Sequence, residues 1–191
     1  ATVGVAPTIT SASSFNSAEN QTSIGTVTAT GDATLVYSII GGADAALLSI
    51  DSSTGALTFD AAPDYDAPGS DAGSNVYEAT AQAANGVSPA ATQDLTITVT
   101  NVADIVPVVT ASQTFDVDED AADNAVIGTV LVTAGDSAIE EWEFVSGNTG
   151  TVFAISSTGV LTKIEPLSHA GTPSYSPVVR ARNAAGWSSG A

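Results

Sequence analysis

The chain has 191 residues, with 21 acidic and 3 basic side chains, a formal net charge of −18 and no cysteine. The absence of cysteine excludes disulfides, zinc–thiolate sites and cysteine nucleophiles. So acidic a chain repels nucleic acid and anionic membranes, because binding either one requires Lys or Arg to replace counterions. We therefore expect no nucleic-acid partner and no membrane insertion, and the acids offer oxygen ligands for Ca²⁺ or Mg²⁺.

The first half of the chain alternates between apolar and polar residues with a period of two. In "DLTITVTNV" (94–102) the apolar side chains fall on one face and the threonines on the other, as in a strand with one buried face. "LVYSII" (35–40) and "VYEATAQA" (76–83) are predicted strands of the same kind. Turn signals such as "STG" and "NG" separate them. About seven short strands at this spacing predict an antiparallel, Greek-key β-sandwich of immunoglobulin-like type.

The second half repeats the first. The matching pairs are 7–20 with 107–120, 24–32 with 127–136, 47–58 with 152–162, and 77–86 with 175–186. We therefore predict two tandem sandwiches, 7–103 and 107–191, joined by a linker at 104–106, with 1–6 as the end of a preceding strand or linker. After "NAAG" the second unit has only "WSSGA", so it is predicted to lack its last strand. One explanation is that the chain is an excerpt of a longer array. The alternative is that the open edge invites strand addition, with residues 1–6 donated by a neighbouring copy.

The order of short motifs resembles cadherin-like repeats along nearly the whole chain. The pieces that carry the resemblance are "AEN" (18–20), "IGTV" (24–27), "LVYSIIGG" (35–42), "SIDSSTGALT" (49–58), "PDYD" (63–66), "VYEATAQA" (76–83) and "TITVTNVADIVP" (96–107). The resemblance implies two cadherin-like β-sandwiches that bind Ca²⁺ at the junction between consecutive domains.

The resemblance also implies a set of calcium ligands. Glu19 matches the glutamate near the start of the first domain, and Asp64 and Asp66 match the acidic pair of its middle loop. Asp104 matches an aspartate of the family's linker motif, and Asp136 matches one acid of the following domain. Carboxylates that converge in this way repel one another unless a cation lies among them. The alternative interpretation of "PDYDAP" is a solvated acidic loop.

Departures from the family pattern limit the number of ions. Ala103 and Ile105 occupy positions where the family has asparagines, which favours one or two ions over three. In the second unit, Leu167 and His169 are interpreted as the replacements of the acidic pair, so Glu119 has lost its partners. We expect no calcium site at that far end.

Other motifs do not support catalysis. "DVDED" (116–120) lacks the glycine and glutamate that an EF-hand loop requires. "GWSSG" (186–190) fits a nucleophile elbow, but the single histidine precedes it and no predicted helix follows. Trp187 is a candidate platform for stacking on a sugar ring, with core or edge packing as the alternative.

These observations predict a non-catalytic, secreted or surface-displayed module of a bacterial surface or virion. Its expected role is that of a Ca²⁺-stiffened structural or adhesive segment in an array or filament. The expected partners are neighbouring copies or adjacent repeats of the parent protein. The alternative function is a carbohydrate-binding module that recognises a cell-surface or matrix glycan.

Overall fold

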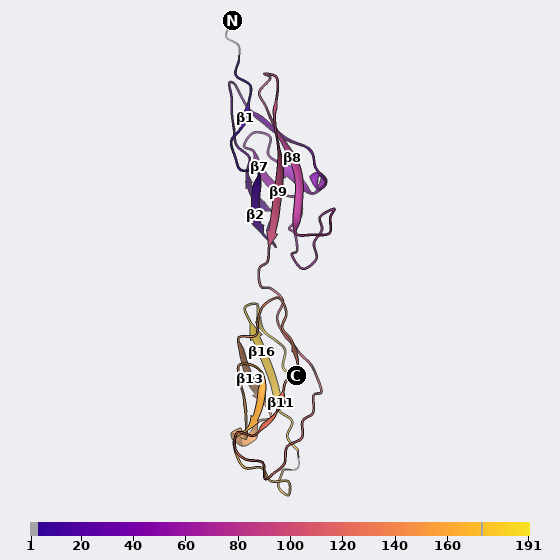
Figure 1. The fold of residues 1–191 in the computed structure, drawn as a ribbon, viewed down its shortest axis with the longest axis vertical. Coiled ribbons are helices and arrows are strands. Elements are labelled where there is room, and N and C mark those ends of the chain that lie inside the picture. Colours follow the sequence, from indigo (N-terminus) through magenta and orange to yellow (C-terminus); the bar gives the residue numbers. More distant parts are fainter. Residues whose placement is uncertain (1–3, 173) are drawn as a thin grey trace. The chain divides into compact units, whose positions relative to one another are not determined.

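The computed structural model describes residues 4–172 and 174–191. They divide into two compact units, Ala1–Val102 and Ala103–Ala191 (Figure 1). Within the described residues the only helical elements are two single 3₁₀ turns, and the predicted all-β sandwich fold is confirmed.

The described residues of the first unit form nine strands and one 3₁₀ turn. In chain order these are β1 (Thr8–Ile9), β2 (Ser14–Ala18), β3 (Ser23–Thr26), β4 (Ala29–Thr30), β5 (Val36–Gly41), η1 (Ala45–Leu47), β6 (Leu48–Ile50), β7 (Ala56–Phe59), β8 (Val76–Ala84) and β9 (Ala91–Thr100). One sheet has the order β2-β9-β8-β5, a second has the order β3-β7-β6, and β1 pairs with β4. The β2–β9 pair is parallel, unlike the antiparallel pairing predicted throughout.

The core of the first unit lies between its two larger sheets. Strand β9 supplies Leu95, Ile97 and Val99, each at most 1% exposed, while the threonines between them point away. Phe59 of β7 and Tyr77 of β8 meet edge to face across the sheets, with ring centroids 5.0 Å apart. The period-two pattern of the sequence therefore locates the core correctly, because alternate residues of a strand face opposite sides of the sheet.

In the second unit, the part that the structure describes forms eight strands and one 3₁₀ turn. These are β10 (Val108–Val109), β11 (Val126–Thr129), β12 (Val132–Thr133), β13 (Glu141–Ser146), η2 (Thr149–Thr151), β14 (Phe153–Ile155), β15 (Val160–Lys163), β16 (Val178–Asn183) and β17 (Gly186–Trp187). The sheets have the orders β13-β16-β17 and β11-β15-β14, and β10 pairs with β12.

The second unit is the less complete sandwich. Its sheet β13-β16-β17 corresponds to β5-β8-β9 of the first unit, but β17 has two residues where β9 has ten. Residues 113–118, which correspond to β2 and its approach, form no strand. The core is accordingly divided into two small clusters, one around Trp142 and one around Phe153. Figure 1 shows the C-terminus beside the middle of this unit, partway along its sheet.

Candidate metal centre

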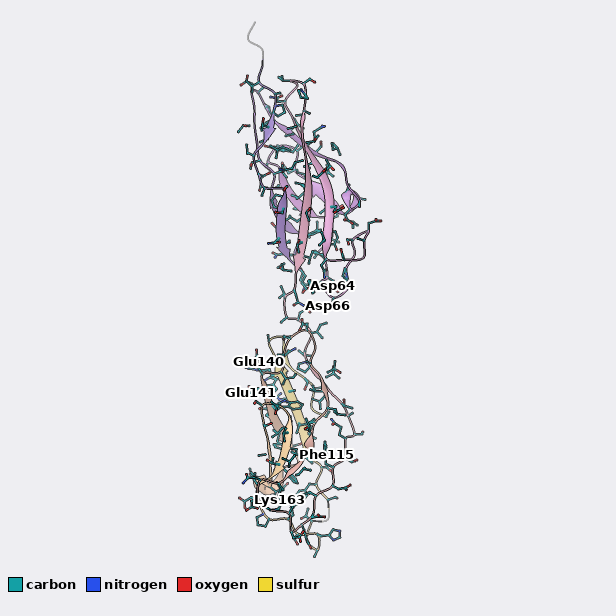
Figure 2. The ribbon with its side chains drawn as sticks, in the orientation of Figure 1. Asp64, Asp66, Phe115, Glu140, Glu141 and Lys163 are labelled. Atoms are coloured by element: carbon teal, nitrogen blue, oxygen red, sulfur yellow. The ribbon has the colours of Figure 1, made fainter. Side chains whose placement is uncertain are left out.

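Asp64 is held by the loop that carries it. In the loop between β7 and β8, the carbonyl of the buried Pro63 accepts the N–H of Asn20 at 2.9 Å. Asp64 Oδ1 then accepts the backbone N–H groups of Asp66 at 2.9 Å and Ala67 at 3.1 Å. An aspartate that bonds the chain two residues ahead forms an Asx turn. This turn keeps Asp64 and Asp66 next to each other at the end of the unit (Figure 2).

Glu19 is the buried member of the centre. It directly follows β2, its backbone N–H donates to Thr100 O at 3.1 Å, and it is only 3% exposed. Its Oε2 accepts the N–H of Tyr65 and its Oε1 the N–H of Val102, both at 2.7 Å. One carboxylate therefore fixes both the acidic loop and the end of the unit's last strand. Each oxygen has a second lone pair, so both can still contact a cation.

The three carboxylates converge. One oxygen each from Glu19, Asp64 and Asp66 lies within 4.8 Å of the others. The first 162 residues of the chain contain no Lys or Arg, so the first unit has no side-chain cation of its own to place among them. Two unit charges about 4 Å apart repel by roughly 1–4 kcal/mol near a protein surface. A hard divalent cation removes that repulsion, and Ca²⁺ takes 6–8 oxygens from carboxylates, carbonyls and water.

Asp104 and Asp136 come together in the second unit. Asp136 Oδ2 accepts the backbone N–H groups of Asp104 at 2.8 Å and Ile105 at 3.2 Å. Burial is the largest single influence and acts to raise the pKa of Asp136, but the backbone hydrogen bonds from Asp104, from Ile105 and from Asp136 itself together outweigh it, so the pKa lies below its ordinary value. Oδ1 of the same carboxylate is buried and has no hydrogen-bond partner among the described residues. The pair offers an ionised carboxylate with one oxygen still to be satisfied.

Sequence reasoning missed the residue that anchors this linker. Asn183 is 1% exposed, and its amide donates to Ile105 O at 2.8 Å and to Ala134 O at 2.9 Å. Gly135, at φ +77°, lets the linker approach, since a Cβ there would lie 2.3 Å from Ile105 O. We call Asp136 and Asn183 the linker clamp.

The first unit has a matching pair of residues that hold the segment just before its first strand. Asp32 Oδ2 accepts the N–H of Val5 at 2.8 Å, and the Asn85 amide donates to Val5 O at 2.9 Å. The matching asparagines of "ANG" and "RNAAG" in the two repeats are the signal that could have identified it. Of the segment considered as a donor strand, residues 1–3 lie outside the described residues, and Val5 is engaged by its own unit.

At the opposite end of the second unit the acids are replaced, but not by the residues predicted. The N–H of His169 donates to Glu119 Oε2 at 2.8 Å, as that of Tyr65 does to Glu19. His169 therefore matches Tyr65, so Ser168 and Ala170 replace Asp64 and Asp66. The prediction that Leu167 and His169 do so is wrong, because it was aligned one residue out of register. Throughout the part of the second unit that the structure describes, no three acids converge around Glu119.

Trp187 and Ser188 have local structural contacts. The Arg180 guanidinium carbon lies 4.5 Å from the centre of the Trp187 ring, and that of Arg182 lies 5.7 Å away. Arg180 also pairs with Glu143. These cation–π contacts favour the packing interpretation of Trp187. The Ser188 side chain is buried, and its hydroxyl oxygen accepts the N–H of Ala181 at 3.0 Å, which is a structural hydrogen bond.

Solved structures supply the fold comparison; no protein-family model and no curated protein matches the chain. Human protocadherin-24 EC1-2 is 18% identical, with a TM-score of 0.69 over 97% of this chain and 92% of that one. The human desmocollin-1 ectodomain is 21% identical (TM-score 0.74), and the protocadherin gammaB7 EC3-6 cis-dimer structure is 20% identical (TM-score 0.70). The desmocollin-1 and protocadherin gammaB7 matches each cover 94% of this chain, but they cover 38% and 48%, respectively, of those longer chains.

None of the described helical elements is long and apolar enough to cross a membrane. The solved structures confirm the fold implied by the sequence motifs: the chain has a cadherin-like β-sandwich fold.

Proposed function

We propose that the chain is a non-catalytic, extracellular structural or adhesive module whose first unit binds Ca²⁺ through Glu19, Asp64 and Asp66. The observation that carries the proposal is the convergence of these three carboxylates on a unit without Lys or Arg. The cadherin ectodomain structures that share the fold support an extracellular setting. Neighbouring copies or adjacent repeats of a parent surface protein, filament or virion appendage are the proposed partners.

We further propose that Asp104 and Asp136 are also calcium ligands, as the resemblance to cadherin-like repeats implies. Asp136 presents a buried Oδ1 that lacks a hydrogen-bond partner among the described residues. A carboxylate oxygen of Asp104 lies within 4.8 Å of one on Asp136. Calcium held at the junction of consecutive domains, as that resemblance implies, would stiffen the module, which is the mechanical role proposed for it.

Thermal unfolding in 5 mM Ca²⁺ and in EDTA tests the proposal. Extracellular modules bind Ca²⁺ with Kd of about 10⁻⁴–10⁻³ M. Millimolar ion then stabilises the folded chain by roughly 1–2 kcal/mol through mass action. For a unit of about 100 residues this amounts to a shift in Tm of several degrees.

The test variant is Asp64→Asn/Asp66→Asn, which removes two charges and keeps an oxygen for the Asx turn. The matched control is Asp116→Asn/Asp118→Asn, an exposed pair with the same spacing in the second unit. Calcium should stabilise the wild type and the control but not the test variant. Equal calcium shifts in the test variant and the control would contradict the proposed site.

The junction is tested separately with Asp136→Asn. Small-angle scattering should show the distribution of interdomain distances narrowing when Ca²⁺ is added to the wild type, and narrowing less in the variant. A distribution that Ca²⁺ leaves unchanged, in a chain whose Tm still rises, would limit the ion to the first unit.

A further inference from the structure

The turn that follows β8 contains the one Asn-Gly pair of the sequence, Asn85–Gly86. An asparagine can lose its amide nitrogen when the backbone nitrogen of the next residue attacks its side-chain carbonyl carbon and closes a five-membered ring. Glycine hinders this attack least, because it has no Cβ and the widest backbone freedom. A residue with a side chain follows every other asparagine of the chain: Asn16, Asn20, Asn75, Asn101, Asn124, Asn148 and Asn183.

The side chain of Asn85 is turned toward the backbone that would attack it. Its Oδ1 accepts the N–H of Val87 at 3.0 Å, which closes an Asx turn around Gly86. The ring of atoms closed by this bond includes the Gly86 nitrogen. The side-chain carbonyl carbon and the attacking nitrogen are therefore held on the same side of the turn.

The turn also has room for the reaction. Gly86 is exposed at φ +81°, and a Cβ built on it would meet nothing within 4 Å. Asn85 itself is half-exposed, so water can reach it. Asn183 forms the same turn in the second unit, where its Oδ1 accepts the Ala185 N–H at 3.0 Å, but it is 1% exposed and Ala184 follows it. Exposure and the following residue thus distinguish two otherwise matching asparagines.

We propose that Asn85–Gly86 is a self-modifying site that converts to isoaspartate or aspartate without an enzyme. The Gly86 nitrogen bonds to Asn85 Cγ, and its proton passes through solvent to Nδ2. The Cγ–Nδ2 bond then breaks, so that Nδ2 leaves as ammonia and a succinimide ring remains. One water molecule opens the ring to either acid. Water is the only other reactant, and no oxidation or reduction takes place.

The conversion removes the group that holds the segment just before β1. Asn85 Nδ2 donates to Val5 O at 2.9 Å and to Asp32 O at 2.6 Å. Either product has a carboxylate in place of the amide, so both hydrogen bonds are lost and a negative charge faces two carbonyl oxygens. Val5 then keeps only the bond from its N–H to Asp32 Oδ2. The site therefore acts as a one-way switch that loosens this segment. This inference goes beyond the proposed calcium function and does not depend on it.

Incubation of the full chain in EDTA at mildly alkaline pH tests the reaction. Isoaspartate is located by mass spectrometry of the digested chain, with isoaspartyl methyltransferase as the labelling probe. It should accumulate at position 85, together with an equimolar amount of ammonia, and not at Asn183. Gly86→Ala should slow the conversion at least about tenfold, which corresponds to a rise of about 1.4 kcal/mol in the barrier.

A second variant is needed because alanine is strained at φ +81°. Asn85→Gln keeps the amide and the charge but would have to close a larger ring, so it should form no isoaspartate. The converted wild type is separated from the unconverted chain by anion exchange, through its additional negative charge. Its Val5 N–H should exchange with solvent at least about tenfold faster, because local opening controls exchange. The Asp104 N–H, which donates to Asp136 in the second unit, is the internal control and should not change.

Any of three results would overturn the proposal. The first is an Asn85 that stays intact in the folded chain but converts in the urea-unfolded chain, which would mean that the fold protects it. The second is conversion of Gly86→Ala at the wild-type rate. The third is a converted chain whose Val5 N–H keeps its full protection. Because every measurement is made in EDTA, these results and those of the calcium test are independent of each other.

Discussion

The backbone N–H of His169 donates to Glu119 Oε2 at 2.8 Å, which reproduces in the second unit the bond between Tyr65 and Glu19. The second unit therefore keeps the hydrogen bond that positions the acidic loop of the first unit, but it has Ser168 and Ala170 in place of the two aspartates. Because a backbone hydrogen bond holds this part of the loop, acids can be introduced at Ser168 and Ala170.

Restoring the acids should create a calcium response in the second unit. In the variant Ser168→Asp/Ala170→Asp, the two new carboxylates would converge with that of Glu119, to make a group of three as in the first unit. We expect the Tm of the second unit to rise in millimolar Ca²⁺ by an amount equivalent to about 1–2 kcal/mol. The control is Ser168→Asn/Ala170→Asn, which should not respond. A variant that binds no Ca²⁺ by calorimetry would show that the loop geometry is not sufficient.

Replacing Glu19 should destabilise the fold even without calcium. Glu19→Gln leaves one oxygen to accept hydrogen bonds where the buried carboxylate accepts two, from Tyr65 and Val102. A buried donor left without its partner costs about 1–3 kcal/mol. Urea unfolding in EDTA measures this cost. The matched variant Glu119→Gln changes an exposed residue, so its cost should be well below that of Glu19→Gln; equal costs would contradict this role of burial.

The apolar face of β9 should carry much of the stability of the first unit. Ile97 is fully buried and Thr96 beside it is exposed. Ile97→Ala should lower the free energy of unfolding by about 2–5 kcal/mol, because it removes buried methyl groups and leaves a cavity. Thr96→Ala should change it by no more than about 0.5 kcal/mol. Similar losses for the two variants, measured by urea unfolding, would show that β9 does not pack as described.

The strand β9 also shows what the sequence could predict. The alternation of Leu95, Ile97 and Val99 with threonines identifies the strand, its buried face and the sandwich, because period-two patterning depends on backbone geometry alone. The parallel pairing of β2 with β9 was not predicted, since pairing direction depends on contacts between distant segments. The family motif selected Glu19, Asp64 and Asp66 as ligands, but not the backbone N–H groups that hold Glu19.

The misalignment at Ser168 has a similar physical cause. The comparison of "EPLSHAG" with "PDYDAP" put Leu167 and His169 at the positions of the two aspartates, but the position of His169 is fixed by a backbone hydrogen bond, which any non-proline residue can make. The linker clamp was missed because an asparagine shortly before a glycine is typical of an ordinary turn. Its role becomes visible only when Ile105, 78 residues away, is placed against Asn183.

Acid should reduce stability in part through Asp51. Hydrogen bonds from the Ser53 hydroxyl, followed by one from the Thr54 backbone, hold the pKa of Asp51 well below its ordinary value of 3.8. A carboxyl whose pKa is lowered on folding stabilises the fold above the unfolded value, and that contribution is lost as the pH falls through the folded pKa. In Asp51→Asn, stability should fall less steeply below pH 3.8. A carboxyl ¹³C titration of Asp51 with a midpoint at or above 3.8 would contradict the assignment.

A substitution of equal size that turns the hydrogen-bond donor of the linker clamp into an acceptor should destabilise the second unit. Asn183→Asp replaces an amide that donates to Ile105 O and Ala134 O with a carboxylate that cannot donate. The position is 1% exposed, so two carbonyls lose their donor and a buried charge faces them. We expect a loss of about 1–3 kcal/mol or more in the free energy of unfolding of the second unit.

The same substitution in the first unit provides the comparison. Asn85 donates to Val5 O and Asp32 O, but it is half-exposed, so water can replace its amide. Asn85→Asp should therefore cost less than Asn183→Asp. Hydrogen exchange gives a direct readout of the clamp: the Asp104 and Ile105 N–H groups, which donate to Asp136, should lose protection in Asn183→Asp. Full protection of both groups in that variant would show that Asp136 alone holds the linker.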